Sequence, residues 1–139
     1  MANTVKLRGD YVHEEAIAAG TITPGHLVMY NSDLKVVVHD SDGDKALAAF
    51  ALEDSLQGNT LDDDYSSDDP VQIGIFRPGD QVNAVIEGGE DVSKGDMVVS
   101  SGNGKLRKLI STDSASDAIG IVMDDFDDSV DTHVAVMIV

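Results

Sequence analysis

Short apolar runs separated by clusters of turn residues recur along the whole chain, and this pattern predicts a protein built mainly from β-strands. Residues 82–86 alternate as a half-buried strand does. Residues 119–122 combine β-branched side chains with an interior glycine, which suits a strand better than a helix. The segment Ser101-Gly-Asn-Gly104 lies between two apolar runs and predicts a hairpin. Further strands are predicted at residues 27–30, 35–39, 71–76, 97–100, 105–110 and 134–139.

Three blocks of the sequence recur in the same order in the second half of the chain. The matching blocks are 16–30 with 85–100, 47–54 with 118–125, and 71–75 with 134–138. In the first pair, Gly25 and Gly95 mark the same turn ahead of an apolar strand. The order of the blocks predicts two pseudo-repeats, at about 13–80 and 81–139, although glycine-turn-valine patterns also recur by chance in β-rich chains.

The repeat decides between helix and strand for two ambiguous segments. Residues 13–20 and 46–52 are each compatible with a helix, but their counterparts in the second repeat alternate or are β-branched, so both are predicted to be strands. Many short strands at close spacing predict an all-β fold, either a small barrel or a sandwich. We expect one β domain over residues 13–139, preceded by an extended arm of residues 1–12. Residues 134–139 are apolar on both faces, which predicts a central or interface strand.

The composition narrows the classes of function. The 139 residues include 26 Asp and Glu against 9 Lys and Arg, which gives a formal net charge of −17 at pH 7. Such a surface repels phosphate backbones and anionic membranes, so neither nucleic acid nor a membrane is expected as a partner. No segment has the pattern of a signal peptide or a membrane span, and we expect a soluble protein made in the cytoplasm. Aromatic residues are 4% of the chain and cysteines are absent, which leaves few stacking platforms and no thiolate chemistry.

No recognisable catalytic or metal-binding motif occurs in the sequence. Asp40, Asp42 and Asp44 alternate as at the start of a calcium-binding EF-hand loop, but Lys45 then stands where that loop needs glycine, and Ala51 where it needs glutamate. We expect no metal ion, and the three carboxylates are only weak candidates for one. The four histidines form no ligand-spaced pair, and the sequence has no nucleophile elbow, phosphate loop or dinucleotide fingerprint. Neither an enzyme nor a bound cofactor is expected.

The few basic residues gather in two places and are the candidate partner-binding residues. In an acidic protein these are the places where an acidic partner, or an acidic loop of another subunit, could dock. The first group alternates with apolar residues, which predicts an arm able to add a strand to a partner's sheet edge; an ordinary first strand of the domain is the alternative. The candidates are Val5, Lys6, Leu7 and Arg8 in the N-terminal segment, and Lys105, Arg107 and Lys108 in the second repeat.

The order of several turn-and-strand motifs resembles the capsid decoration, or cement, proteins of tailed bacteriophages. The resemblance covers nearly the whole chain after about residue 13 and does not include the N-terminal segment or the aspartates at 62–69. The motifs are Thr21-Ile-Thr-Pro-Gly-His-Leu-Val28, Ala49-Phe-Ala-Leu-Glu-Asp54, Gly58-Asn-Thr-Leu-Asp-Asp63 followed by Tyr65, Pro70-Val-Gln-Ile-Gly74, Pro78-Gly-Asp-Gln-Val82, Gly95-Asp-Met-Val-Val-Ser-Ser-Gly-Asn-Gly-Lys-Leu106 and Ala118-Ile-Gly-Ile-Val122.

This resemblance implies a small β-rich protein, often a homotrimer, that binds the outer face of an assembled capsid where major capsid protein subunits meet. The implied function is structural: the bound protein cross-links neighbouring capsid subunits and reinforces the shell from the outer surface of the virion. The expected partners are then the major capsid protein and further copies of this chain. From the residues alone, a calcium-dependent surface-binding or adhesion module that uses the acidic loops stays open as an alternative.

Overall fold

The computed structural model describes residues 3–139, and its regular structure is almost entirely β-strand, as the sequence predicts. Two single turns of 3-10 helix, Ser55–Gln57 (η1) and Ala115–Asp117 (η2), interrupt the strands and have no clear signal in the sequence. The strands are β1 (Lys6–Arg8), β2 (Val12–Ile17), β3 (Val28–Tyr30), β4 (Val36–Val38), β5 (Ala49–Ala51), β6 (Pro70–Ile75), β7 (Gln81–Ile86), β8 (Met97–Ser100), β9 (Leu106–Lys108), β10 (Gly120–Val122) and β11 (Thr132–Ile138).

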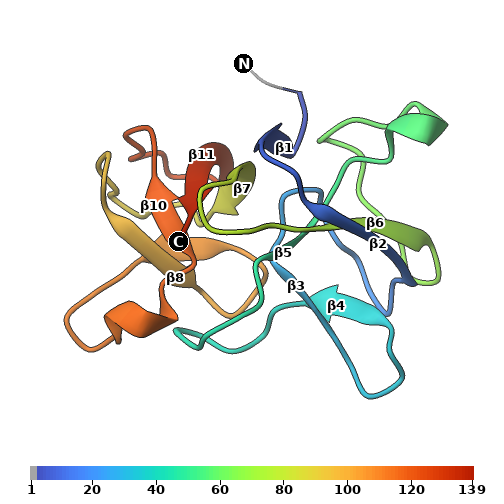
Figure 1. The fold of residues 1–139 in the computed structure, drawn as a ribbon, viewed down its shortest axis with the longest axis horizontal. Coiled ribbons are helices and arrows are strands. Elements are labelled where there is room, and N and C mark those ends of the chain that lie inside the picture. Colours follow the sequence, from blue (N-terminus) through green and yellow to red (C-terminus); the bar gives the residue numbers. More distant parts are fainter. Residues whose placement is uncertain (1–2) are drawn as a thin grey trace.

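Five strands of the second half close into a barrel, shown at the left of Figure 1. Their order is β7-β11-β10-β8-β9, and β9 pairs back to β7 through Ile86 and Leu106. The hairpin predicted at residues 101–104 joins β8 to β9. β11 lies between β7 and β10 and buries alternate side chains, from Val134 to Ile138. The prediction of a central strand at residues 134–139 is therefore confirmed.

The first half pairs its strands in the same scheme, and its β2–β6 ladder is as long as the β7–β11 ladder of the barrel. β2, β6 and β5 form a three-stranded sheet, and the β3–β4 hairpin joins it through two isolated bridges, Ala18–Val36 and Leu27–Phe50. In chain order, β2 to β6 correspond to β7 to β11. The Ala18–Val36 bridge therefore corresponds to the β7–β9 pairing, and the Leu27–Phe50 bridge corresponds to the β8–β10 pairing. A tandem duplication would produce this correspondence; the duplication itself stays a prediction.

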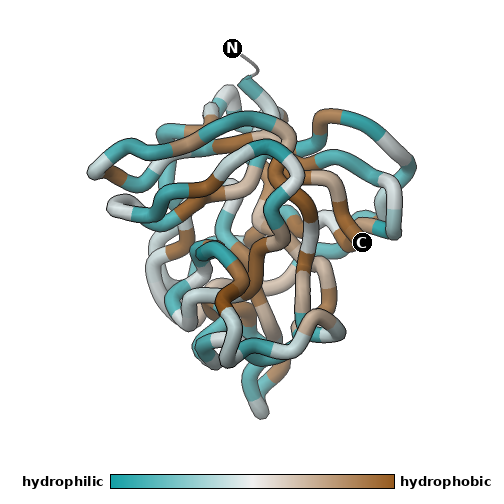
Figure 2. Tube along the Cα trace, turned by 90° about the vertical axis from the view of Figure 1, so that its left-hand side faces the viewer, coloured by the Kyte–Doolittle hydropathy of each residue, from teal (hydrophilic) through white to brown (hydrophobic). Residues whose placement is uncertain are grey.

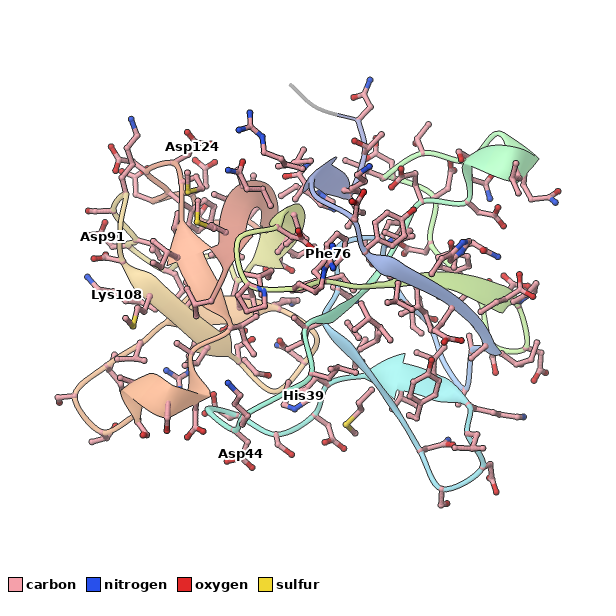
Figure 3. The ribbon with its side chains drawn as sticks, in the orientation of Figure 1. His39, Asp44, Phe76, Asp91, Lys108 and Asp124 are labelled. Carbon is pink, nitrogen blue, oxygen red and sulfur yellow. The ribbon has the colours of Figure 1, made fainter. Side chains whose placement is uncertain are left out.

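One hydrophobic cluster spans both halves, and a second, which includes Ile22, Val36 and Ile73, lies within the first half. Phe50 of β5 is fully buried and lies edge-on to Phe76, with ring centroids 6.0 Å apart. Both rings belong to a cluster that also contains Leu27 from the first half and Val82 and Val136 from the barrel. Figure 3 labels Phe76 between the two groups of strands, and Figure 2 shows hydrophobic residues concentrated in the interior of the trace. Because the cluster spans both halves, they form one packing unit.

The N-terminal segment is a strand of the domain, which corrects the predicted extended arm of residues 1–12. β1 pairs antiparallel with β7, and the adjacent Val5 is fully buried in the shared core. The Val5 N–H donates to the Glu53 carboxylate at 2.8 Å, and its carbonyl accepts from the Asn83 N–H at 2.7 Å. The arm prediction was wrong because β7 offers this segment both an open edge and an apolar pocket. Residues 1–2 lie outside the described residues.

The predicted segment 46–52 is a strand over a shorter length than expected. The strand begins at Ala49, so residues 45–48 form a loop ahead of it. Within residues 3–139, no helix has the length and apolar character needed to cross a membrane.

Substitution of Val5 tests whether β1 is part of the fold. Val5→Ala removes buried methyl groups and leaves a cavity, so it should lower the free energy of unfolding by about 2 kcal/mol. Val12→Ala is the matched control, because Val12 is 54% exposed, and it should change stability by less than about 0.5 kcal/mol. Urea unfolding followed by circular dichroism measures both. Equal stability of the two variants would mean that β1 is not part of the cooperative core.

Candidate functional site

The predicted basic cluster of Lys105, Arg107 and Lys108, on and just before β9, is paired with acidic residues of the same chain. Lys105 Nζ lies 2.7 Å from an oxygen of Asp131, and Lys108 Nζ lies 3.2 Å from an oxygen of Asp96. Arg107 binds two carboxylates, described below. The positive charges of Lys105, Arg107 and Lys108 are thus compensated within the molecule. Their use for an acidic partner stays a prediction that would require these pairs to rearrange.

Arg107 connects the loop after β4 to the second half of the chain. Its side chain is only 16% exposed, and its Nη1 and Nη2 donate to the two oxygens of Asp113 at 2.7 and 2.9 Å. Its Nε donates to Asp42 at 2.8 Å. The bidentate bond to Arg107, with a further bond from the Ile110 N–H, lowers the pKa of Asp113 to about 2. This geometry is that of a structural ion-pair network.

The weak metal candidates Asp40, Asp42 and Asp44 lie in the loop between β4 and β5. Asp42 is bound to Arg107, and Asp40 accepts a hydrogen bond from the Ser41 hydroxyl at 3.2 Å. Within residues 3–139, no three or more histidine or acidic side chains are grouped so that they could hold a metal ion.

The four N-terminal candidates lie on or next to β1 and do not form one surface. Val5 is buried, whereas Lys6 and Arg8 are exposed, and Lys6 Nζ lies 5.8 Å from the centre of the Tyr11 ring. Leu7 faces a groove of about 330 Å³ that also contains several carboxylates. The groove is lined by Leu7, Asn83, Asp124, Asp125, Phe126, Asp127, Asp128 and residues 132–135.

Many of the acidic residues close turns, a role that sequence reasoning missed. In five turns an aspartate side chain accepts a hydrogen bond from the backbone N–H three residues earlier. The donor and acceptor pairs are Thr60 with Asp63, Ser66 with Asp69, Arg77 with Asp80, Ser93 with Asp96, and Ile110 with Asp113, at 2.7 to 2.9 Å. The recurrence of aspartate after a turn glycine, in Pro78-Gly-Asp80 and Lys94-Gly-Asp96, was the available signal.

Histidine takes the place of aspartate in one turn of this kind. In Thr23-Pro-Gly-His26, the Thr23 N–H donates to His26 Nδ1 at 3.2 Å. Burial, reinforced by the positive charge of Lys105, lowers the pKa of His26 to about 4. The neighbouring His133 donates from Nε2 to the Pro24 carbonyl at 2.6 Å. His26 is therefore held neutral inside the fold.

A buried histidine, His39, bridges the two halves. His39 Nδ1 lies 2.6 Å from the Ser100 hydroxyl, which also accepts a hydrogen bond from the Gly102 N–H. This arrangement suits a hydroxyl that donates its proton to Nδ1 of a neutral imidazole. Burial lowers the pKa of His39. His39 is labelled in Figure 3 at the lower junction of the halves, a position that suits a structural role.

An apolar surface surrounds the loop ahead of β5. Leu47 is 61% exposed and stands between two apolar grooves of about 400 and 280 Å³. One groove includes Phe76, Pro78, Ile119, Ile138 and Val139, and the other includes Val28, Met29, Tyr30 and Ala49. Exposed apolar surface of this kind commonly marks interaction sites. Sequence reasoning missed it because this segment was expected to be strand.

Comparison with known proteins supports the fold over almost the whole chain. No family model matches the sequence, and no curated protein matches it. Among solved structures, the chain has the fold of a phage head fiber base. That structure is the head fiber gp8.5 N base of bacteriophage phi29, which is 15% identical, with a TM-score of 0.61 over 94% of this chain and 95% of the other. At this identity the likeness establishes the fold alone.

The half-buried His26 should make the fold sensitive to mild acid. In the folded protein its imidazole stays neutral down to a pKa of about 4, whereas in the unfolded chain it takes up a proton near pH 6.5. The unfolded state therefore binds more protons between these values. Stability should fall as the pH drops through this window, with His26 contributing about 2 kcal/mol of loss between neutral pH and about pH 5.

Urea unfolding of the wild type and two variants at both pH values measures this contribution. Asn in His26→Asn can still accept from the Thr23 N–H but does not titrate, so this variant should lose about 2 kcal/mol less than the wild type on acidification. His13→Asn, at an exposed position, should lose as much as the wild type. Identical losses in all three proteins would contradict the assignment to His26.

Proposed function

We propose that this chain is a structural protein associated with a bacteriophage head. The observation that carries the proposal is the shared fold with a phage head fiber base, which extends over 94% of this chain and 95% of the other. A match of that extent involves the complete arrangement of both halves rather than one common β motif. The order of turn-and-strand motifs, which resembles capsid decoration proteins, gives independent support from the sequence.

In its finer form, the proposal is that the protein binds the outside of the head as a non-enzymatic decoration protein. It would cross-link major capsid protein subunits and act as a homotrimer. The net charge of −17 supports this role, because it keeps free protein soluble and away from DNA. The apolar surface around Leu47 supplies contact area of the kind such binding needs. Many copies on one lattice would add their separate stabilising contributions.

Binding to assembled heads tests the proposal directly. Heads built from the major capsid protein of the phage that encodes this chain, and lacking the chain itself, should bring the purified protein down on sedimentation at a saturable ratio. Bound protein should raise the temperature at which the heads release DNA, because binding to the assembled form stabilises that form. If the purified protein does not co-sediment with the heads, the proposal is contradicted. The mass of the free protein in solution decides whether it is a homotrimer.

Leu47 provides a matched test of the apolar surface. Leu47→Asp places a charge in the proposed contact and should weaken head binding by about tenfold or more. Leu56→Asp is the control, because Leu56 is 90% exposed on η1 and lines neither apolar groove. Both substitutions should leave the unfolding midpoint nearly unchanged. If both variants bind as the wild type does, this surface is not the contact.

A further inference from the structure

The outer edge of β2 is unpaired. β2 stands at the end of the β2-β6-β5 sheet and forms a ladder with β6 alone. Just beyond the strand, the Ala18 N–H donates toward the β6 side, to Asp69, and the Ala19 N–H donates to the opposite side, to Val36. Because backbone groups alternate along a strand, the N–H groups of Glu15 and Ile17 point to that same outer side. Neither has a hydrogen-bond acceptor among residues 3–139.

β7 in the second half corresponds to β2, and its equivalent edge is paired with other segments of the chain. The parallel bridges Ala18–Val36 and Ile86–Leu106 join corresponding strands and therefore align β2 with β7. In this alignment Glu14 corresponds to Val82, Glu15 to Asn83, and Ile17 to Val85.

The edge of β7 is filled at these aligned positions. The Asn83 N–H donates to the Val5 carbonyl beside β1 at 2.7 Å, and the Val85 N–H donates to the Gly25 carbonyl at 3.2 Å. Lys6 of β1 stands directly opposite Val82. The first half has the same edge, but no described residue from 3 to 80 forms an equivalent of β1 on it.

The side chains of β2 determine which charge an added strand should carry. Glu14 and Glu15 are exposed and stand where β7 has Val82 and Asn83. Like charges opposite one another are unfavourable, so this edge resists pairing with a second copy of β2. A strand that carries lysine or arginine among apolar residues would instead place a cation opposite Glu14. β1 of a second copy is an unsuitable source, because Val5 is buried in its own core.

We propose that the outer edge of β2, residues 12–17, accepts an extended basic segment of a partner protein as an added strand. Backbone hydrogen bonds to Glu15 and Ile17 would hold the segment, and the two glutamates would select its charge. Only the identification of the partner as a protein of the phage head rests on the proposed function. The capacity of the edge to bind a basic strand does not depend on it.

A peptide with the sequence of residues 4–9, Thr-Val-Lys-Leu-Arg-Gly with blocked ends, is the probe. Titrated into the full-length, nitrogen-15-labelled protein, it should produce saturable shifts of the backbone amides in residues 12–17 and slow their hydrogen exchange. Binding should weaken as salt is added. A peptide with glutamate in place of its lysine and arginine should bind at least about tenfold more weakly. The proposal is overturned if these amides do not respond, or if the response falls on Val82 and Asn83, which would mean displacement of β1.

Two substitutions at Glu15 separate backbone pairing from charge. Glu15→Pro removes the outward N–H, which the fold does not use, and should weaken peptide binding by about tenfold or more. Glu15→Ala keeps the N–H and should weaken it by no more than about threefold. Equal binding by both variants would overturn the added-strand geometry. If the proline variant does not fold, the amide response of the wild type and the charge-reversed peptide still decide the question.

The peptide-binding experiment and the co-sedimentation experiment test the two proposals separately. Loss of peptide binding with normal co-sedimentation would overturn the strand site and leave the head association standing. Peptide binding at β2 without co-sedimentation would remove the proposed function and leave the strand site.

Discussion

The fold depends on backbone hydrogen bonds that β7 makes along both of its edges. β7 is buried over nearly its whole length and pairs with β11 along one edge, while β1 and β9 share the other. A buried backbone polar group without a partner is costly, so each of these contacts is needed. β9 closes the barrel by reaching β7, and β1 extends the shared core by carrying Val5 into it. Within residues 3–80 the first half has no strand equivalent to β1, and this difference leaves β2 exposed to solvent.

The sequence was sufficient to predict the class of fold and most of the strands. Alternation identified β7, β-branching identified β10, and the glycine-rich turn at 101–104 identified the β8–β9 hairpin. Strand ends were less predictable, because in 46–52 and 105–110 the pairing partner, rather than the local pattern, decides where the ladder stops. The arm prediction failed for a related reason. Val5-Lys-Leu-Arg8 has the same alternation whether it pairs with its own chain or another, and only the position of β7 decides between them.

The candidate site was harder to predict than the fold. Basic residues in an acidic chain indicate docking sites when each residue is considered alone. The fold instead places Lys105, Arg107 and Lys108 beside carboxylates, some nearby in the sequence, such as Asp113, and some distant, such as Asp42. The apolar surface around Leu47 depends on where β5 begins. The aspartates also divide into classes that composition does not separate. Some, such as Asp63, accept turn hydrogen bonds and keep their negative charge, whereas others, such as Asp113 beside Arg107, are paired with a cation.

The position of β1 constrains how the molecule can assemble itself. A strand near residue 6 pairs with one near residue 82, and β7 is also paired with β11, whose last residue is Ile138. Contacts between such distant parts of a chain slow folding, because loop closure must precede the gain from packing. During synthesis, the early hairpins can form first, but the common core cannot close until the end of β11 has left the ribosome. β11 therefore completes the environment in which Val5, next to β1, is buried.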